Sequence, residues 1–239
     1  VQTCALPIYQ SSDDHSHAKE IALPEGSIVN GSIIDRNAVT AALKKLWKLG
    51  RFTTRNVVFS VDGVSITSAD LVDLDQDDGR TNGLAILIAS ETLIDARLRP
   101  LATEAVPTAL IRSTDGNCKP QETVAMVEIG SDVVTVAIAQ DSQLIFTKSF
   151  ANQGTDIASL TLQSAFGITY QEACKRIQEL DDNLDTSIEW KRRTQEIVDT
   201  WTRSIASLVA DCLEQFSHEH QGSPISSIAL TGYGTSISG

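Results

Sequence analysis

The chain has 239 residues, of which 41% are hydrophobic, and 19 Lys and Arg against 31 Asp and Glu give a formal net charge of −12 at pH 7. This hydrophobic content is typical of a globular protein with one or two domains and excludes a disordered chain. The excess of negative charge argues against binding to nucleic acid or to an anionic membrane surface, because both depend on clustered cations.

The two ends of the sequence do not resemble the ends of a domain. Val1–Ile8 has neither helix nor strand character and is interpreted as non-native sequence, and Tyr9–Glu20 is expected to form an exposed polar loop. Residues 1–20 are therefore assigned to a non-native or disordered leader. The far end stops in a glycine-rich turn just after an apolar strand, so the sequence is expected to be an internal piece of a longer protein.

The first half of the chain is expected to contain a helix, a hairpin and a strand. Asp35 is a favourable N-cap for a helix over Arg36–Leu49, where apolar residues recur at spacings of three and four. Val57–Val61 and Val64–Thr67 flank an Asp-Gly pair, which is typical of a two-residue hairpin turn. Leu84–Ala89 is predicted to be a buried strand that is followed by a short helix.

The second half has clearer signals. A meander of three apolar strands precedes two short helices, a long amphipathic helix and a final buried strand. These elements are predicted over Thr123–Ile129, Val133–Ala139, Leu144–Ser149, Thr155–Phe166, Tyr170–Leu180, Ser187–Phe216 and Ile225–Leu230. Helices combined with a mixed sheet in each half indicate the α/β class.

Two glycine turns follow predicted strands. Glu128 precedes the turn Gly130–Asp132, where backbone N–H groups and a hydroxyl can bind phosphate and the acid can order a metal-bound water. Gly232 and Gly234 lie in a second turn, where a flat base or ribose can lie against the backbone. Ligands in α/β sheets bind at strand ends, so the two turns are predicted to line opposite walls of one nucleotide crevice. Two ordinary β-turns are the alternative.

The order of these segments resembles the PilM family, which comprises the actin-like, FtsA-related assembly proteins of type IV pilus machines. The resemblance covers about Ile21 to Gly239, and VEIGSD (Val127–Asp132), GTDI (Gly154–Ile157) and LTGYG (Leu230–Gly234) occur in the family's order. It implies an actin-like α/β fold of two lobes with an inserted subdomain in the first lobe. A partial first lobe, a second lobe and the start of an adenosine-loop segment would then cover residues 21–122, 123–222 and 223–239.

The resemblance also implies ATP and Mg²⁺ as cofactors. The residues that match the family's nucleotide-binding positions are Gly130, Ser131, Asp132, Gly154, Asp156, Glu172, Lys175, Gly232, Gly234 and Thr235. Glu128 stands at the catalytic position, where the family has Asp, and Cys174 stands where it has an acid. Tyr233 replaces a glycine, and its ring is expected either to stack on the base or to block it. The first phosphate loop has no match before Ile21, so weak nucleotide binding is expected.

The resemblance further implies a cytoplasmic protein that reaches the inner membrane only indirectly. Its partner would be the short cytoplasmic tail of the membrane protein PilN, bound in a groove of the first lobe, and its oligomeric state is left open. Three functions follow from this. The first is an ATP-dependent assembly adaptor with at most a slow regulatory ATPase activity. The alternatives are a nucleotide-independent scaffold of the same fold and an FtsA-like cell-division protein.

Overall fold

The computed structural model describes residues 8–12, 15–19, 21, 23–24, 26–29, 32–61, 77–113, 122–180, 188–220 and 224–237. These residues form two compact units, one made of the described residues from Ile8 to Val106 and the other of those from Pro107 onward. The division therefore lies between Val106 and Pro107, and not near residue 122 as expected. The reason is that the segment after Pro107 forms a helix whose Ile111 is buried against the sheet of the second unit.

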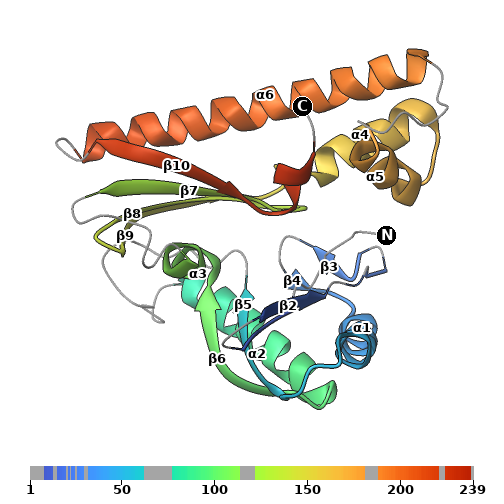
Figure 1. Ribbon diagram of the computed structural model, residues 1–239, viewed down its shortest axis with the longest axis vertical. Coiled ribbons are helices and arrows are strands. Elements are labelled where there is room, and N and C mark those ends of the chain that lie inside the picture. Colours follow the sequence, from blue (N-terminus) through green and yellow to red (C-terminus); the bar gives the residue numbers. More distant parts are fainter. Residues whose placement is uncertain are drawn as a thin grey trace. The chain divides into compact units, whose positions relative to one another are not determined.

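The first unit combines two helices with three pairs of short strands in its described part. They are β1 (Ile8–Ser12), β2 (His15–Lys19), β3 (Ile28–Val29), β4 (Ser32–Ile33), α1 (Arg36–Gly50), β5 (Asn56–Val61), α2 (Asp77–Asp95) and β6 (Arg99–Ala105) (Figure 1). The pairs β1–β2 and β3–β4 are antiparallel, and β5–β6 is parallel. The exposed loop expected over Tyr9–Glu20, and with it the disordered leader, is therefore wrong for the residues of β1 and β2.

Helix α1 begins where the sequence predicts. The N–H of Ala38 donates a hydrogen bond to the Asp35 carboxylate at 2.9 Å, which confirms Asp35 as the N-cap. The helix ends one residue later than expected, because Arg51, with φ of 52°, takes the left-handed position that closes it. Its buried face, which includes Leu43 and Trp47, packs with Leu93 of α2 into the core of this unit.

Two expectations for the first unit need correction. Leu84–Ala89 is not a buried strand: it lies inside α2, and Leu84 and Leu87 are 57% and 54% exposed. A short apolar run does not distinguish a helix from a strand, so the sequence alone could not decide between them. The expected strand Val57–Val61 forms most of β5, but it pairs in parallel with β6. The expected second hairpin strand, Val64–Thr67, lies outside the described residues.

The second unit is a four-stranded sheet with helices on both faces. Its elements are α3 (Val106–Ser113), β7 (Thr123–Ile129), β8 (Val134–Gln140), β9 (Gln143–Phe150), α4 (Asp156–Phe166), α5 (Tyr170–Gln178), α6 (Ile188–Glu219), β10 (Ile225–Thr231) and the 3₁₀ turn η1 (Tyr233–Ser236) (Figure 1). The strand order is β10-β7-β8-β9, with the meander antiparallel and β10 parallel to β7. The predicted meander, the two short helices and the long helix are thus confirmed.

The sequence predicts that strand β10 is buried, but it is largely exposed. Ile228 and Leu230 are 52% and 62% exposed, because β10 is an edge strand of the sheet.

The tight turn between β8 and β9 is as predicted: Asp141 and Ser142 both have positive φ, 52° and 61°, as a type I′ hairpin turn requires.

Each face of the sheet has its own core. Val127, Val136 and Ile138 are fully buried on the face that α6 covers, together with Val198 and Trp201 of that helix (Figure 1). On the other face, Val124 and Met126 pack against Ile111 of α3. Each fully buried aliphatic side chain contributes on the order of 1.5–3 kcal/mol. The two cores hold the carboxyl ends of β7 and β10 together at one edge of the sheet.

A candidate ligand site at two glycine turns

The two glycine turns of the sequence lie next to each other. Because β7 and β10 are parallel and Thr231 pairs with Glu128, the residues that follow each strand leave the sheet at the same edge. A Cβ placed on Gly232 would lie 2.6 Å from the carbonyl oxygen of Ile129, and one on Gly234 would lie 2.3 Å from the Ile129 side chain. The turns therefore lie side by side on one unit, and not on opposite walls as expected.

The turn between β7 and β8 is closed tightly by its own backbone. The N–H of Gly130 donates to the carbonyl oxygen of Val133 at 3.0 Å, and a Cβ on Gly130 would lie 2.9 Å from that same oxygen. Real Cβ atoms do not approach backbone oxygen so closely, so only glycine fits here without a shift of the backbone. The sequence reasoning identified this glycine, and the structure gives its steric reason.

The segment before α4 fixes the shape of that turn. The N–H groups of Thr155 and Asp156 donate to the carbonyl oxygens of Gly130 and Ser131 at 3.1 and 2.8 Å, and two further amides donate to Asp132. A Cβ on Gly154 would lie 2.3 Å from the Ser131 carbonyl oxygen. The phosphate-type turn and the start of α4 thus form one hydrogen-bonded assembly, in which Gly154 permits the close backbone contact.

A row of polar side chains crosses the sheet beside the turns. Thr231, Glu128, Thr135 and Ser149 are paired in register across β10, β7, β8 and β9, so their side chains share one face. Glu128 is half-buried, with Oε1 3.7 Å from the Cβ position of Gly130, and the hydroxyls of Thr135 and Ser149 lie 3.2 Å apart. Sequence reasoning identified Glu128 but missed Thr135 and Thr231. Thr135 could have been found, because pairing the residues on the two sides of the Gly130 turn places it opposite Glu128.

Asp156 is buried at the start of α4. It is only 7% exposed, and its Oδ1 accepts a hydrogen bond from the Tyr170 hydroxyl of α5. Burial, and next the hydrogen bond to Asp156, raise the pKa of Tyr170 well above its ordinary value, which keeps the phenol neutral. The structure thus places this predicted nucleotide contact inside the packing between α4 and α5, where it holds the two helices together.

Two further predicted residues, Glu172 and Lys175, lie on α5. The Glu172 carboxylate accepts hydrogen bonds from the backbone N–H of Thr169 at 3.0 Å and from its hydroxyl at 2.9 Å, and these bonds lower the pKa of Glu172. Thr169 caps Glu172 in return, which completes a capping box. Lys175 is 70% exposed and lies 3.5 Å from Glu179. Glu172 therefore supports the start of its own helix, and Lys175 presents its ammonium group at the surface.

Tyr233, in the turn after β10, contacts α5. Gln178 donates a hydrogen bond from Nε2 to the Tyr233 hydroxyl. Within the turn, the Thr235 hydroxyl donates to the carbonyl oxygen of Gly232 at 2.8 Å, so this predicted ligand residue also stabilises the turn. The Cys174 thiol of α5 donates to the Ser159 hydroxyl of α4 at 3.4 Å.

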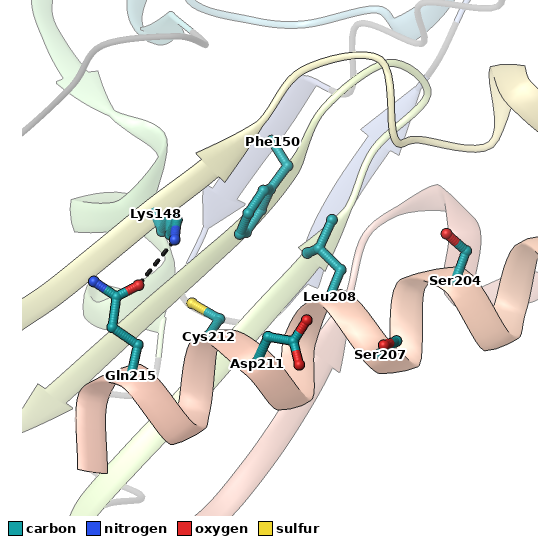
Figure 2. Close-up of a pocket in the computed structure, with 8 residues that line it drawn as sticks. All are labelled: Lys148, Phe150, Ser204, Ser207, Leu208, Asp211, Cys212 and Gln215. Atoms are coloured by element: carbon teal, nitrogen blue, oxygen red, sulfur yellow. Dashed lines mark hydrogen bonds between the residues drawn. The ribbon is translucent and has the colours of Figure 1, made fainter. Parts of the chain in front are cut away.

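A separate cavity of about 430 Å³ lies between the edge strand β9 and α6. Figure 2 shows Phe150 and Leu208 pointing toward each other, and Lys148 donating to Gln215 at 2.9 Å. Cys212 is one of the residues that line it, and burial raises the pKa of this thiol. None of the residues of the two glycine turns lines this cavity, so it is distinct from the candidate site.

Comparisons with known proteins show the fold. Neither a protein-family model nor a curated protein matches the sequence. Among solved structures, the PilM-PilN type IV pilus biogenesis complex matches with a TM-score of 0.78 at 14% identity, covering 99% of this chain and 81% of that chain.

Two further solved structures match this chain at the same low sequence identity. The ethanolamine utilization protein EutJ from Carboxydothermus hydrogenoformans gives a TM-score of 0.61 at 14% identity, covering 92% of this chain and 68% of its own. MreB5 of Spiroplasma citri bound to ADP gives 0.57 at 14% identity, covering 94% and 70%. The chain therefore has an actin-like α/β fold, as expected.

Proposed function

We propose that the chain is a nucleotide-binding, actin-like adaptor of type IV pilus assembly that takes ATP with Mg²⁺ and docks on the cytoplasmic tail of a PilN-like membrane protein. The observation that carries the proposal is the adjacency of the Gly130 and Gly232 turns at the carboxyl ends of β7 and β10. Such a strand edge is where α/β proteins bind ligands. The likeness to the PilM-PilN complex and to ADP-bound MreB5 supports both parts of the proposal.

The backbone of the two turns would hold the nucleotide. The β7–β8 turn, which Gly130 allows to close tightly, would present oriented backbone N–H groups that favour the negative charge of phosphate. Glu128, near the carboxyl end of β7, would hold Mg²⁺ through water while the phosphates supply the other oxygens. Phosphoryl transfer depends mainly on positioned charge, so the longer arm of Glu128 compared with Asp suits at most a slow, regulatory hydrolysis.

The docking partner would bring the chain to the inner membrane. None of the helices in the described ranges is long and apolar enough to cross a membrane. An adaptor of this kind stays in the cytoplasm and reaches the membrane through the tail that it binds. Its charge of −12 suits a protein partner better than an anionic lipid surface.

Thermal unfolding with and without Mg-ATP tests the nucleotide part. With a dissociation constant of about 1 mM, 5 mM Mg-ATP should stabilise the chain by roughly 1 kcal/mol and raise Tm by about 2–4 °C. Gly130→Ala should abolish the shift, because its Cβ would meet the Val133 carbonyl oxygen. Gly167→Ala, where no atom lies within 4 Å, should keep it. The absence of a shift in the wild-type chain would rule out the nucleotide site.

A nucleotide-independent scaffold is the second candidate, and specific contacts favour it. Tyr233 is bonded to Gln178 beside the turn, and the carboxylates of Asp156 and Glu172 already serve the packing and capping of helices. The two candidates differ in their binding of a PilN tail peptide. The adaptor should bind the peptide at least fivefold more tightly with 5 mM Mg-ATP than without it, by isothermal titration. Equal affinity in both conditions would support the scaffold.

A further inference from the structure

Tyr233 stands between two glycines that fix the direction of its side chain. Gly232, with φ of 92°, and Gly234 both lie so close to Ile129 that neither can carry a Cβ without a shift of β7. The turn therefore has no space on the side of β7. The Tyr233 side chain leaves on another side, and its hydroxyl reaches Gln178 at the end of α5.

The phenol ring thus spans from the glycine turn to one face of α5. Gln178 follows Lys175 by three residues, so the two side chains share a helix face. The resemblance implies that Lys175 lies beside the nucleotide, and the sequence predicts that a flat base lies against the Gly232 turn. The half-buried ring lies between these two elements and is held there at its hydroxyl end.

We propose that Tyr233 is a specificity-determining residue of the candidate site: in this conformation its ring occupies the place of a purine base, and the Gln178 hydrogen bond holds it there. This inference rests on the proposed nucleotide site and concerns only its base end. A flat base and a flat phenol ring compete for the same slot between the turn and α5. Phosphates, which need only the Gly130 turn, do not compete with the ring.

The competition makes the two ends of a nucleotide respond differently to substitution. Removing the ring frees the base slot and leaves the Gly130 turn, which belongs to another loop, unchanged. Removing only the hydrogen bond lets the ring move but leaves it present, so the expected gain in affinity for Mg-ATP is smaller. A ring that instead stacks on a bound base would produce the opposite sign when it is removed.

The test uses the full chain and four proteins: wild type, Tyr233→Ala, Tyr233→Phe and Gln178→Ala. Dissociation constants are measured by NMR titration with Mg-ATP and, separately, with inorganic tripolyphosphate. We expect Tyr233→Ala to bind Mg-ATP at least tenfold more tightly than wild type. Tyr233→Phe and Gln178→Ala should each gain two- to fivefold. Tripolyphosphate affinity should stay within twofold in all four proteins.

Three other outcomes are possible, and each contradicts either the role of Tyr233 or the nucleotide site itself. An unchanged or weaker affinity of Tyr233→Ala for Mg-ATP, with wild-type binding intact, overturns the role of Tyr233 and leaves the nucleotide site standing. A parallel gain for tripolyphosphate shows a general opening of the site and also overturns it. If neither wild type nor any variant binds Mg-ATP or tripolyphosphate at 5 mM, the proposed nucleotide site itself fails. Circular dichroism confirms that each variant is folded, and Gln178→Ala tests the tether without changing the turn.

Discussion

Gly232→Ala is expected to lower the free energy of unfolding by about 3–5 kcal/mol, the sum of the penalty for a backbone conformation that only glycine readily adopts and of a steric clash. Gly232 has φ of 92°, and a Cβ there would lie 2.6 Å from the carbonyl oxygen and 2.9 Å from the nitrogen of Ile129. These atoms belong to the backbone of β7, which is bonded on both sides in the sheet. The clash cannot be relieved by a side-chain rotation, so either β7 or the turn must move.

The measurement is urea-induced unfolding followed by far-UV circular dichroism and tryptophan fluorescence, since Trp201 is buried in the core of the second unit. Gly167→Ala is the matched control. Gly167 has a positive φ of 62° as well, but no atom lies within 4 Å of its Cβ position, so we expect a loss of only about 1 kcal/mol. Equal losses in the two variants would contradict the close contact between the Gly232 turn and β7.

Those parts of the fold that depend on local chemistry could be predicted from the sequence. The N-cap at Asp35, the Asp141–Ser142 turn and the long helix each have a local signal, namely a cap, a turn pair or a sustained helical period. The Leu84–Ala89 run has no such signal, because a short apolar segment suits a strand and a helix equally. The parallel pairing of β5 with β6 joins segments separated by α2, and no local pattern in either strand specifies it.

The same division holds at the candidate site. The glycine turns were visible in the sequence because close backbone contacts demand glycine. The roles of Asp156 and Thr231 were not visible, since they depend on Tyr170 from another helix and on a strand register with β7. The capping box of Glu172 was readable, because Thr169 precedes it by three residues at the start of a helix. A local structural role can thus be recognised before a ligand is assigned to such a residue.

Tyr170→Phe is expected to lower the free energy of unfolding by about 2–3 kcal/mol at pH 8, because it leaves a buried carboxylate without its hydroxyl donor. Asp156 is 7% exposed and accepts a hydrogen bond from the Tyr170 hydroxyl, which is itself part of a side chain that is only 4% exposed. The phenylalanine ring fills nearly the same volume, so the loss reports the polar contact and not a cavity.

The difference between the two proteins should depend on pH in a defined direction. Burial and the contact with Asp156 raise the pKa of Tyr170 in the folded chain above the value of 10.0 that it has when unfolded. A raised pKa stabilises the neutral form, so this contribution is fully present below about pH 10 and is lost as the pH rises above it. Between pH 10 and 11, the advantage of the wild type over Tyr170→Phe should shrink by about 1 kcal/mol, approaching ~1.4 kcal/mol per pH unit. Urea titrations of both proteins at pH 8, 10 and 11 measure the difference, and subtracting the two removes the titration of all other groups. A difference that stays constant to pH 11 would mean that the Tyr170 hydroxyl ionises as freely in the folded chain as in the unfolded one, and that Asp156 is not bonded to it.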